Sequence, residues 1–420
     1  MRILTVVYDL DIGGTQRAAV TFANAFARSG HDSRILVTDG RGSREADVDP
    51  GVVVRGPQAD LTQFDEWVPD VVHIHGHGLD EAMVRRLHST RARSATWVEQ
   101  NVFARTTAWT ELIDCTFLFS RWCEHQYATS PGVHVAAARV PNPIDSRHFF
   151  RDTVSASALR LALGIPADAI VVGRIGQPQT YKWSPLIIDA FDAWADRDSR
   201  AWLLLVGAPD EIPSRAQSSR HRDRIVLVDQ LTGDEALRAH YSAMDILGHV
   251  ALQGETFGYV LVEASLCEVP IVTLSTPWAD NSQGEVVGHE VGGLVTTSKP
   301  GFLEAVRTLA ADPRLRDELG KAGRVRVMAN YDSQAVAQIA LERMHTPQSV
   351  AAMQSDELLS AYSLALDPPR GIRRLAFNRR MWPTVAWLSG VRSPGWLVQT
   401  TLNRWGISRH GFSRPTAARG

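Results

Sequence analysis

The chain has 420 residues, of which 44% are hydrophobic and 21% charged, with a formal net charge of −2 at pH 7. This composition is typical of a globular protein in solution, and the length allows two domains, each with its own core. No apolar segment is long enough to cross a bilayer, and three scattered cysteines form neither a disulfide framework nor a metal-ligand pair. The N-terminus leads directly into a predicted strand and is not expected to be a signal peptide, so we expect a cytoplasmic protein.

Predicted strands and helices alternate along the first 140 residues. A strand over residues 3–8 precedes Gly13 and Gly14, and the apolar residues of 15–29 share one face of a predicted helix. Further strands are expected at residues 33–37, 52–54, 71–74, 95–98, 115–119 and 134–140. The alternation predicts one doubly wound unit.

A second unit begins after a break. Pro141 and Pro143 interrupt the pattern, and the polar residues up to 157 predict a linker. Strands are then expected at residues 170–174, 202–206, 225–228, 244–252 and 271–274, with a helix over 260–267. We predict an α/β fold in which two Rossmann-like doubly wound domains, residues 1–145 and 146–345, face each other across a ligand-binding cleft, followed by an extension at 346–420.

Two carboxylates, Glu255 and Glu263, stand eight residues apart on a predicted strand, turn and helix. The free amides of residues 256–259 and the positive helix end favour a phosphate. Apolar neighbours surround Glu263, whose burial would be costly without hydrogen-bond donors, and sugar hydroxyls could be those donors. The pattern alone is equally compatible with a solvated Glu255 and with Glu263 at the polar edge of an amphipathic helix.

Histidines alternate at the end of the predicted strand 71–74, at His73, His75 and His77. They could indicate a metal, but no nearby cysteine or carboxylate pair completes a site, so we expect no metal and interpret His75 as a cleft residue. Gly13 and Gly14 could let the chain approach a phosphate closely or could form a simple tight turn. The lack of a third spaced glycine argues against a dinucleotide fingerprint.

The basic tail, residues 368–420, contains ten arginines and four tryptophans but no lysine and no acidic residue. Residues 1–367 therefore hold 34 basic and 46 acidic side chains, a net charge of −12. Arginine interleaved with tryptophan is expected of a segment at an anionic membrane surface, which would make the protein peripheral at the inner face of the membrane. A tail docked on the acidic body is an equal alternative, and no nucleic-acid partner is expected.

In their order along the chain, several motifs between residue 1 and about residue 330 resemble the retaining nucleotide-sugar glycosyltransferases of the GT-B fold, specifically family 4. These motifs are Gly13-Gly14, Ser29-Gly30-His31, residues 69–75, Val140-Pro141-Asn142, Val172-Gly173-Arg174 with Lys182, residues 204–207, the pair Glu255 and Glu263, residues 285–287 and residues 292–295.

The resemblance implies a donor substrate that is a UDP- or GDP-sugar, a hydroxyl acceptor, and no cofactor or metal. It implies that Arg174 and Lys182 bind the diphosphate, where fixed cations stabilise the charge of the transition state. Glu255 would hold the transferred sugar, and Glu263 would bind the ribose. The remaining donor-binding positions implied are Gly13, Gly14, Thr256, Phe257 and Gly258.

The sequence also departs from this family. A histidine that relatives often have near the catalytic centre is replaced by Glu99-Gln100-Asn101, so Glu99, Gln100 and Asn101 are candidates for its role, and Glu99 and Asn101 are candidate cleft residues. Residues 276–283 replace a plainer glycine-rich loop, which makes Asp280 and Asn281 candidates for the acceptor or sugar pocket. Two alternatives remain open: an enzyme without transfer, such as a nucleotide-sugar epimerase, and a catalytically idle binding subunit.

Overall fold

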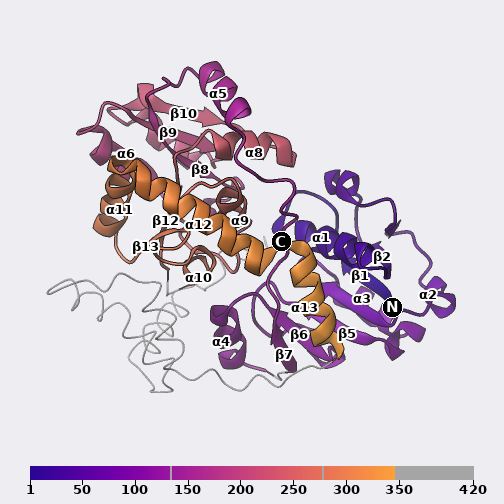
Figure 1. Ribbon diagram of the computed structural model, residues 1–420. Coiled ribbons are helices and arrows are strands. Elements are labelled where there is room, and N and C mark those ends of the chain that lie inside the picture. The colour runs from indigo at the N-terminus through magenta and orange to yellow at the C-terminus, as the bar shows by residue number, and fades with distance from the viewer. Residues whose placement is uncertain (133–134, 277–278, 346–420) are drawn as a thin grey trace, which may run out of the picture.

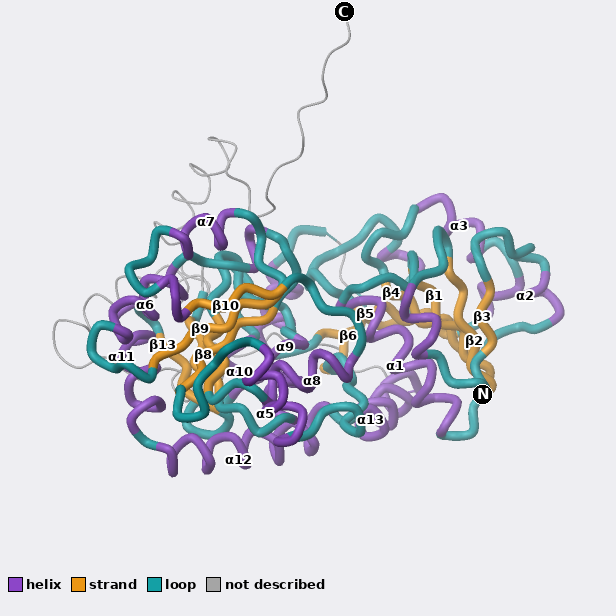
Figure 2. Tube along the Cα trace, turned by 90° about the horizontal axis from the view of Figure 1, so that it is seen from above, coloured by secondary structure: helices purple, strands orange, loops and turns teal. Residues whose placement is uncertain are grey.

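The computed structural model describes residues 1–345 except 133–134 and 277–278. Two parallel sheets, each flanked by helices, stand side by side (Figure 1). Figure 2 shows the same two sheets from above, with helices on both of their faces. The predicted α/β fold of two Rossmann-like domains is confirmed. The extension at 346–420, with the basic tail, lies outside the described residues.

The first domain contains a seven-stranded sheet in the order β3-β2-β1-β4-β5-β6-β7. Strands such as β1 and β4 are buried almost throughout, as expected for parallel strands covered on both faces. The strands are β1 (Arg2–Val7), β2 (Asp32–Val37), β3 (Val53–Arg55), β4 (Val71–His75), β5 (Thr96–Gln100), β6 (Cys115–Leu118) and β7 (Ala136–Arg139). The helices are α1 (Gly14–Arg28), α2 (Gln63–Glu66), α3 (Glu81–His88) and α4 (Arg121–Thr129), with short 3-10 turns at Ser43–Asp47, Arg91–Ser94 and Thr110–Leu112.

The second domain contains a six-stranded sheet in the order β10-β9-β8-β11-β12-β13. Its strands are β8 (Ile170–Ile175), β9 (Ala201–Val206), β10 (Ile225–Val228), β11 (Ile246–His249), β12 (Ile271–Leu274) and β13 (Gly293–Thr296). Its helices are α5 (Thr153–Ala162), α6 (Leu186–Ala195), α7 (Glu211–Gln217), α8 (Asp234–Ser242), α9 (Tyr259–Leu266), α10 (Gln283–Val287), α11 (Lys299–Ala311) and α12 (Pro313–Tyr331), with 3-10 turns at Thr180–Lys182 and Arg222–Arg224.

Two local predictions were wrong, and one strand was missed. The linker does not extend to residue 157, because Asp152 caps the N-terminus of α5 by accepting a hydrogen bond from the Ser155 amide. β11 is shorter than residues 244–252, since Leu252 leaves the sheet and its amide bonds to the Tyr181 carbonyl. β13 was not predicted as a strand, although it pairs with β12 along its whole length.

The last described helix, α13 (Ser333–His345), returns to the first domain (Figure 1). Its buried face packs against Phe22 and Phe26 of α1 and against β6. At the crossing, the Ile144 amide bonds to the Tyr331 carbonyl at 2.8 Å, and the Ser333 amide bonds to the Ile144 carbonyl at 2.9 Å. The two segments that join the domains are therefore hydrogen-bonded to each other. Within the described part of the chain, no helix combines the length and apolarity needed to span a membrane.

Candidate active site

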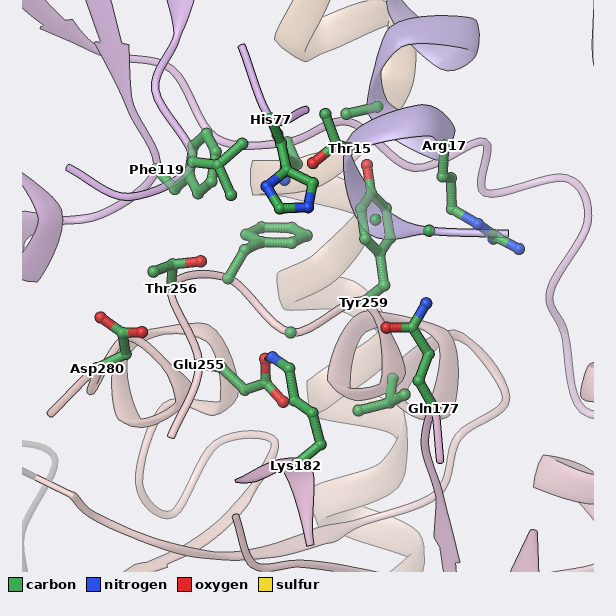
Figure 3. Close-up of a pocket in the computed structure, with 18 of the residues that line it drawn as sticks. Thr15, Arg17, His77, Phe119, Gln177, Lys182, Glu255, Thr256, Tyr259 and Asp280 are labelled. Atoms are coloured by element: carbon green, nitrogen blue, oxygen red, sulfur yellow. Dashed lines mark hydrogen bonds and ion pairs between the residues drawn. The ribbon is translucent and has the colours of Figure 1, made fainter. Parts of the chain in front are cut away.

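A cavity of about 920 Å³ lies between the two domains and is lined by both. The first domain contributes the start of α1 and the loops after β4 and β5, and the second contributes the end of β8 and the loop that leads into α9. Figure 3 shows Glu255 and Lys182 on one side of this cleft and His77 and Thr15 on the other. The cleft therefore lies at the carboxyl ends of the strands, where open parallel sheets bind ligands.

Glu255 is buried and forms an ion pair with Lys182. Its second carboxylate oxygen lies 3.4 Å from His249 Nε2. Burial acts to raise the pKa of Glu255, but the nearby Lys182 ammonium and His249 outweigh it and hold this pKa well below its usual range. Glu255 is thus a fixed anion at the floor of the cleft, and Lys182 is its counterion.

Two glycines shape the turn that carries Glu255 and leads into α9. Gly254 and Gly258 both have left-handed backbone conformations, with φ of +67° and +91°. A Cβ at Gly254 would lie 1.9 Å from the Asp280 carbonyl oxygen, so only glycine fits there. Thr256 and Phe257, between them, line the cleft together with Gly258.

Arg174 comes from the end of β8 and is only 1% exposed. Its guanidinium donates to the carbonyls of Ile175 and Lys182 and lies 5.1 Å from the Trp183 ring centre. No carboxylate among the described residues forms an ion pair with it. Burial lowers the pKa of Arg174 to about 10, so the side chain remains a cation at neutral pH. A buried cation held only by carbonyls can bind an anionic ligand in the cleft.

Glu263 has donors within the protein. Its carboxylate accepts a hydrogen bond from the Tyr241 hydroxyl at 2.7 Å and forms an ion pair with Arg17 Nη1 at 3.1 Å. The inference that sugar hydroxyls could be the donors that permit its burial was therefore incomplete, because two protein groups already compensate the charge. Glu263 nevertheless lines the cleft, where a ligand can reach it.

Arg17 was missed by the sequence analysis. It belongs to α1 of the first domain, yet it pairs with Glu263 and Asp234 of the second. Its guanidinium also lies 5.4 Å and 5.7 Å from the ring centres of Phe149 and Tyr259. Burial acts to lower the pKa of Arg17, but the two carboxylates outweigh it and raise this pKa. On α1, Arg17 shares its face with Thr21, Asn24 and Arg28, so its local pattern is that of an ordinary solvated cation.

Gly13 and Gly14 both line the cleft at the start of α1. Gly13 is the N-cap residue and has an extended backbone with φ of −172°, which any residue can adopt. A Cβ on Gly14 would lie 3.3 Å from the Tyr259 ring. Gly14 therefore lies where the two domains approach each other closely.

The candidate acceptor residues fall into two groups. His75 and Asp280 line the cleft, whereas Glu99, Asn101 and Asn281 are not among its lining residues. Burial and the neighbouring His73 hold the pKa of His75 well below its usual value, so its imidazole is neutral.

The three other candidates form hydrogen bonds within the protein: Glu99 at the end of β5, and Asn101 and Asn281 in loops. Glu99 accepts hydrogen bonds from Trp109 Nε1 at 3.0 Å and Asn101 Nδ2 at 3.4 Å, and burial raises the pKa of Glu99 to about 7. Asn281 accepts from the Thr276 amide at 2.7 Å. Gln100, which follows Glu99, is the residue of this segment that lines the cleft directly, and its side chain donates to Asn142.

No group of three or more histidine, cysteine, aspartate or glutamate side chains in the described ranges is arranged to hold a metal ion. His73 and His75 lie with ring centres 4.5 Å apart, packed against Phe22. These imidazoles therefore belong to an aromatic cluster beneath the cleft.

Comparisons with known proteins find similarity to glycosyltransferases. Residues 157–326 match the family model described as Glycosyl transferases group 1. A D-inositol 3-phosphate glycosyltransferase of Kineococcus radiotolerans is 30% identical over 184 residues, which cover 39% of this chain and 41% of the relative. A GDP-mannose-dependent alpha-(1-6)-phosphatidylinositol monomannoside mannosyltransferase of Mycolicibacterium smegmatis is 26% identical over 52% of this chain and 58% of its own.

The matches thus span about two fifths of the first relative and under three fifths of the second. Among solved structures, Anabaena HepE in complex with UDP and glucose superposes with a TM-score of 0.68 at 17% identity, covering 82% of this chain and all of that chain. This likeness shows the fold. The described chain has the GT-B fold, and within it residues 157–326 match the glycosyl transferases group 1 family model.

Proposed function

We propose that this protein is a retaining, metal-independent glycosyltransferase of family 4, which transfers a sugar from a nucleotide diphosphate sugar to a hydroxyl acceptor. The observation that carries the proposal is Arg174, a buried cation in the cleft that forms no ion pair with any carboxylate of the described ranges. Next to it, Lys182 supplies a second cation and forms an ion pair with the carboxylate of Glu255. The first domain, residues 1–145, would bind the acceptor, and residues 146–345 would bind the donor.

The proposed chemistry uses the cations at the leaving group. As the bond between the sugar and the phosphate breaks, negative charge develops on the diphosphate, and Arg174 and Lys182 stabilise it. The acceptor oxygen forms its bond on the same face of the sugar, and its proton passes to the departing phosphate. Glu255 holds hydroxyls of the transferred sugar, and Glu263 holds the ribose. Positive side chains and backbone amides replace a metal in this scheme.

The donor is proposed to be a UDP- or GDP-sugar. HepE was solved with UDP, and the M. smegmatis relative is named as GDP-mannose-dependent. The names of the curated relatives make inositol 3-phosphate a first acceptor to try. A lipid-linked acceptor would fit a peripheral position at the inner membrane face, which we propose on the basis of the basic tail at 368–420.

The proposal is tested with the purified full chain. UDP and GDP are first compared by thermal shift, because a ligand bound only by the folded state raises its melting temperature. The nucleotide that binds then selects a panel of its sugar conjugates, and transfer to inositol 3-phosphate is followed by product analysis, with the anomeric configuration read by NMR.

We expect the wild type to transfer the sugar with retention, and we expect Arg174→Ala to transfer it much more slowly. If neither nucleotide shifts the melting temperature, the proposal is refuted. Release of an epimerised or free sugar, with no transfer to any hydroxyl, would favour the enzyme without transfer.

A further inference from the structure

The wall of the cleft formed by the loop after β5 carries a second cation without a carboxylate partner. Arg105 is half-buried and lines the cleft. Its guanidinium lies 4.9 Å from the ring centre of Phe103. No ion pair joins Arg105 to any carboxylate of the residues that the structure describes.

The other cations of the cleft are accounted for. Arg17 and Lys182 pair with Glu263 and Glu255, and an outlying Arg44 pairs with Asp47. That leaves two cleft arginines without a carboxylate in the described ranges. Arg174, in the second domain, is the one assigned above to the donor diphosphate. Arg105 lies in the first domain and therefore has no assigned anion.

The loop is built to hold Arg105 in place. The Asn101 side chain donates to the Arg105 carbonyl at 2.8 Å and accepts from the Arg105 amide at 3.3 Å. Between them, Ala104 has a left-handed backbone with φ of 49°, which is strained for a residue with a Cβ. Strain of this kind persists only where surrounding contacts enforce it, and Asn101 supplies them.

A second donor contacts the same Phe103 ring. His77 also lines the cleft, and its ring centre lies 5.3 Å from that of Phe103. The Phe103 ring is thus contacted by His77 and by Arg105. Figure 3 shows the His77 imidazole directed into the cleft from the first domain. An arginine and a histidine beside one aromatic ring form a site for an anion attached to an apolar or polyol body.

We propose that the acceptor carries a phosphate group, which Arg105 binds with His77 on the wall of the first domain. This inference rests on the proposed function, because it concerns the acceptor side of the same cleft. A planar guanidinium can donate two parallel hydrogen bonds to a phosphate. The phosphate belongs either to a phosphomonoester of a small polyol or to the phosphodiester of a lipid headgroup, since both present the same oxygens.

The test compares phosphorylated and unphosphorylated probes on the full chain. UDP or GDP, whichever binds, is kept at saturation so that the diphosphate site is filled. Inorganic phosphate, inositol 3-phosphate, short-chain phosphatidylinositol and inositol are then titrated. We expect the phosphate-bearing probe of the correct class to bind roughly 10- to 100-fold more tightly than inositol, the range for hydrogen bonds to charged groups. The monoester and the diester probes distinguish the two sources.

Three variants complete the design. Arg105→Gln should remove the preference for phosphate while nucleotide affinity stays unchanged, and Arg105→Lys should restore part of it. Arg93→Gln changes an exposed arginine of the same domain that does not line the cleft, and should have no effect.

Equal binding of all probes, no binding of any, or a preference that survives Arg105→Gln would each overturn the inference. If no nucleotide binds, the titration is repeated on Arg174→Ala without nucleotide. A phosphate preference that depends on Arg105 would then stand although the proposed function had failed.

Discussion

The ion pair between Arg17 and Glu263 should contribute measurably to stability, because both side chains are almost fully buried. They are 7% and 4% exposed, and their charged atoms are 3.1 Å apart. Arg17→Met leaves the buried Glu263 carboxylate with its hydrogen bond from the Tyr241 hydroxyl, and removing one partner of a buried pair costs about 3–5 kcal/mol. A loss of about 3 kcal/mol would lower the melting temperature of a domain of this size by roughly 6–12 °C.

A double-mutant cycle isolates this interaction. Glu263→Gln keeps a hydrogen-bond partner for Tyr241 but removes the charge that faces Arg17. The free energy of unfolding is measured by urea titration for both single variants and for the double variant. We expect the double variant to be about 2 kcal/mol more stable than the sum of the single effects predicts, within the range found for residues in direct contact. Glu263→Gln should in addition weaken nucleotide binding.

The matched control is Arg85→Met, which removes two ion pairs of similar length from the surface. Arg85 is 44% exposed, so its pairs with Glu81 and Glu111 should contribute less than about 1 kcal/mol. Coupling near zero in the cycle, or equal losses for Arg17→Met and Arg85→Met, would refute the reasoning. Ligand hydroxyls would then be favoured as the groups that compensate the buried Glu263 carboxylate.

Four further outcomes are expected. Arg174→Ala or Lys182→Ala should each lower turnover on the order of 10²–10³-fold, as for other groups that stabilise a developing anion, and losses below tenfold at both would place the diphosphate elsewhere. Burial raises the pKa of Glu99 in the folded protein to about 7, above its usual 4.5. The neutral carboxyl therefore favours the folded state fully below pH 4.5, and this contribution to the free energy of unfolding is lost as the pH rises through 7. Glu99→Gln should therefore gain up to roughly 3 kcal/mol relative to the wild type between pH 4.5 and 8, and parallel urea profiles at the two pH values would contradict this. EDTA should leave transfer unchanged, whereas loss of activity restored by a divalent ion would reverse the metal-independent proposal. Deleting 368–420 should abolish salt-sensitive binding to anionic vesicles in co-sedimentation, while a tail docked on the body predicts no vesicle binding by the full chain and a lower melting temperature after deletion.

Local patterns were enough to predict the two sheets. β1, β4, β8 and β9 are short, mostly apolar segments, and this signal lies within each segment. The position of Glu255 and Glu263 on either side of a helix start could be predicted for the same reason. β13 was missed because its first residue, Gly293, follows another glycine, a pattern more typical of a loop.

Contacts between distant segments could not be predicted. Arg17 and Asp234 are 217 residues apart, and nothing local to either indicates the other. The same limit applies to Glu99, a candidate cleft residue on β5 that accepts hydrogen bonds from Trp109 and Asn101 in the loop after this strand. Sequence spacing indicated that these residues end a strand near the cleft, but the direction of each side chain is decided by tertiary packing.

The return of α13 to the first domain has a consequence for how the chain is made. Ribosomes deliver the N-terminal domain first, yet part of its apolar surface, including Phe22 and Phe26, is covered by residues 333–345. A nascent chain must therefore expose this surface until the whole second domain has been synthesised. Assembly of the first domain is thereby linked to completion of the second, and a translation product that stops before Ser333 would present an apolar patch open to chaperones or to aggregation.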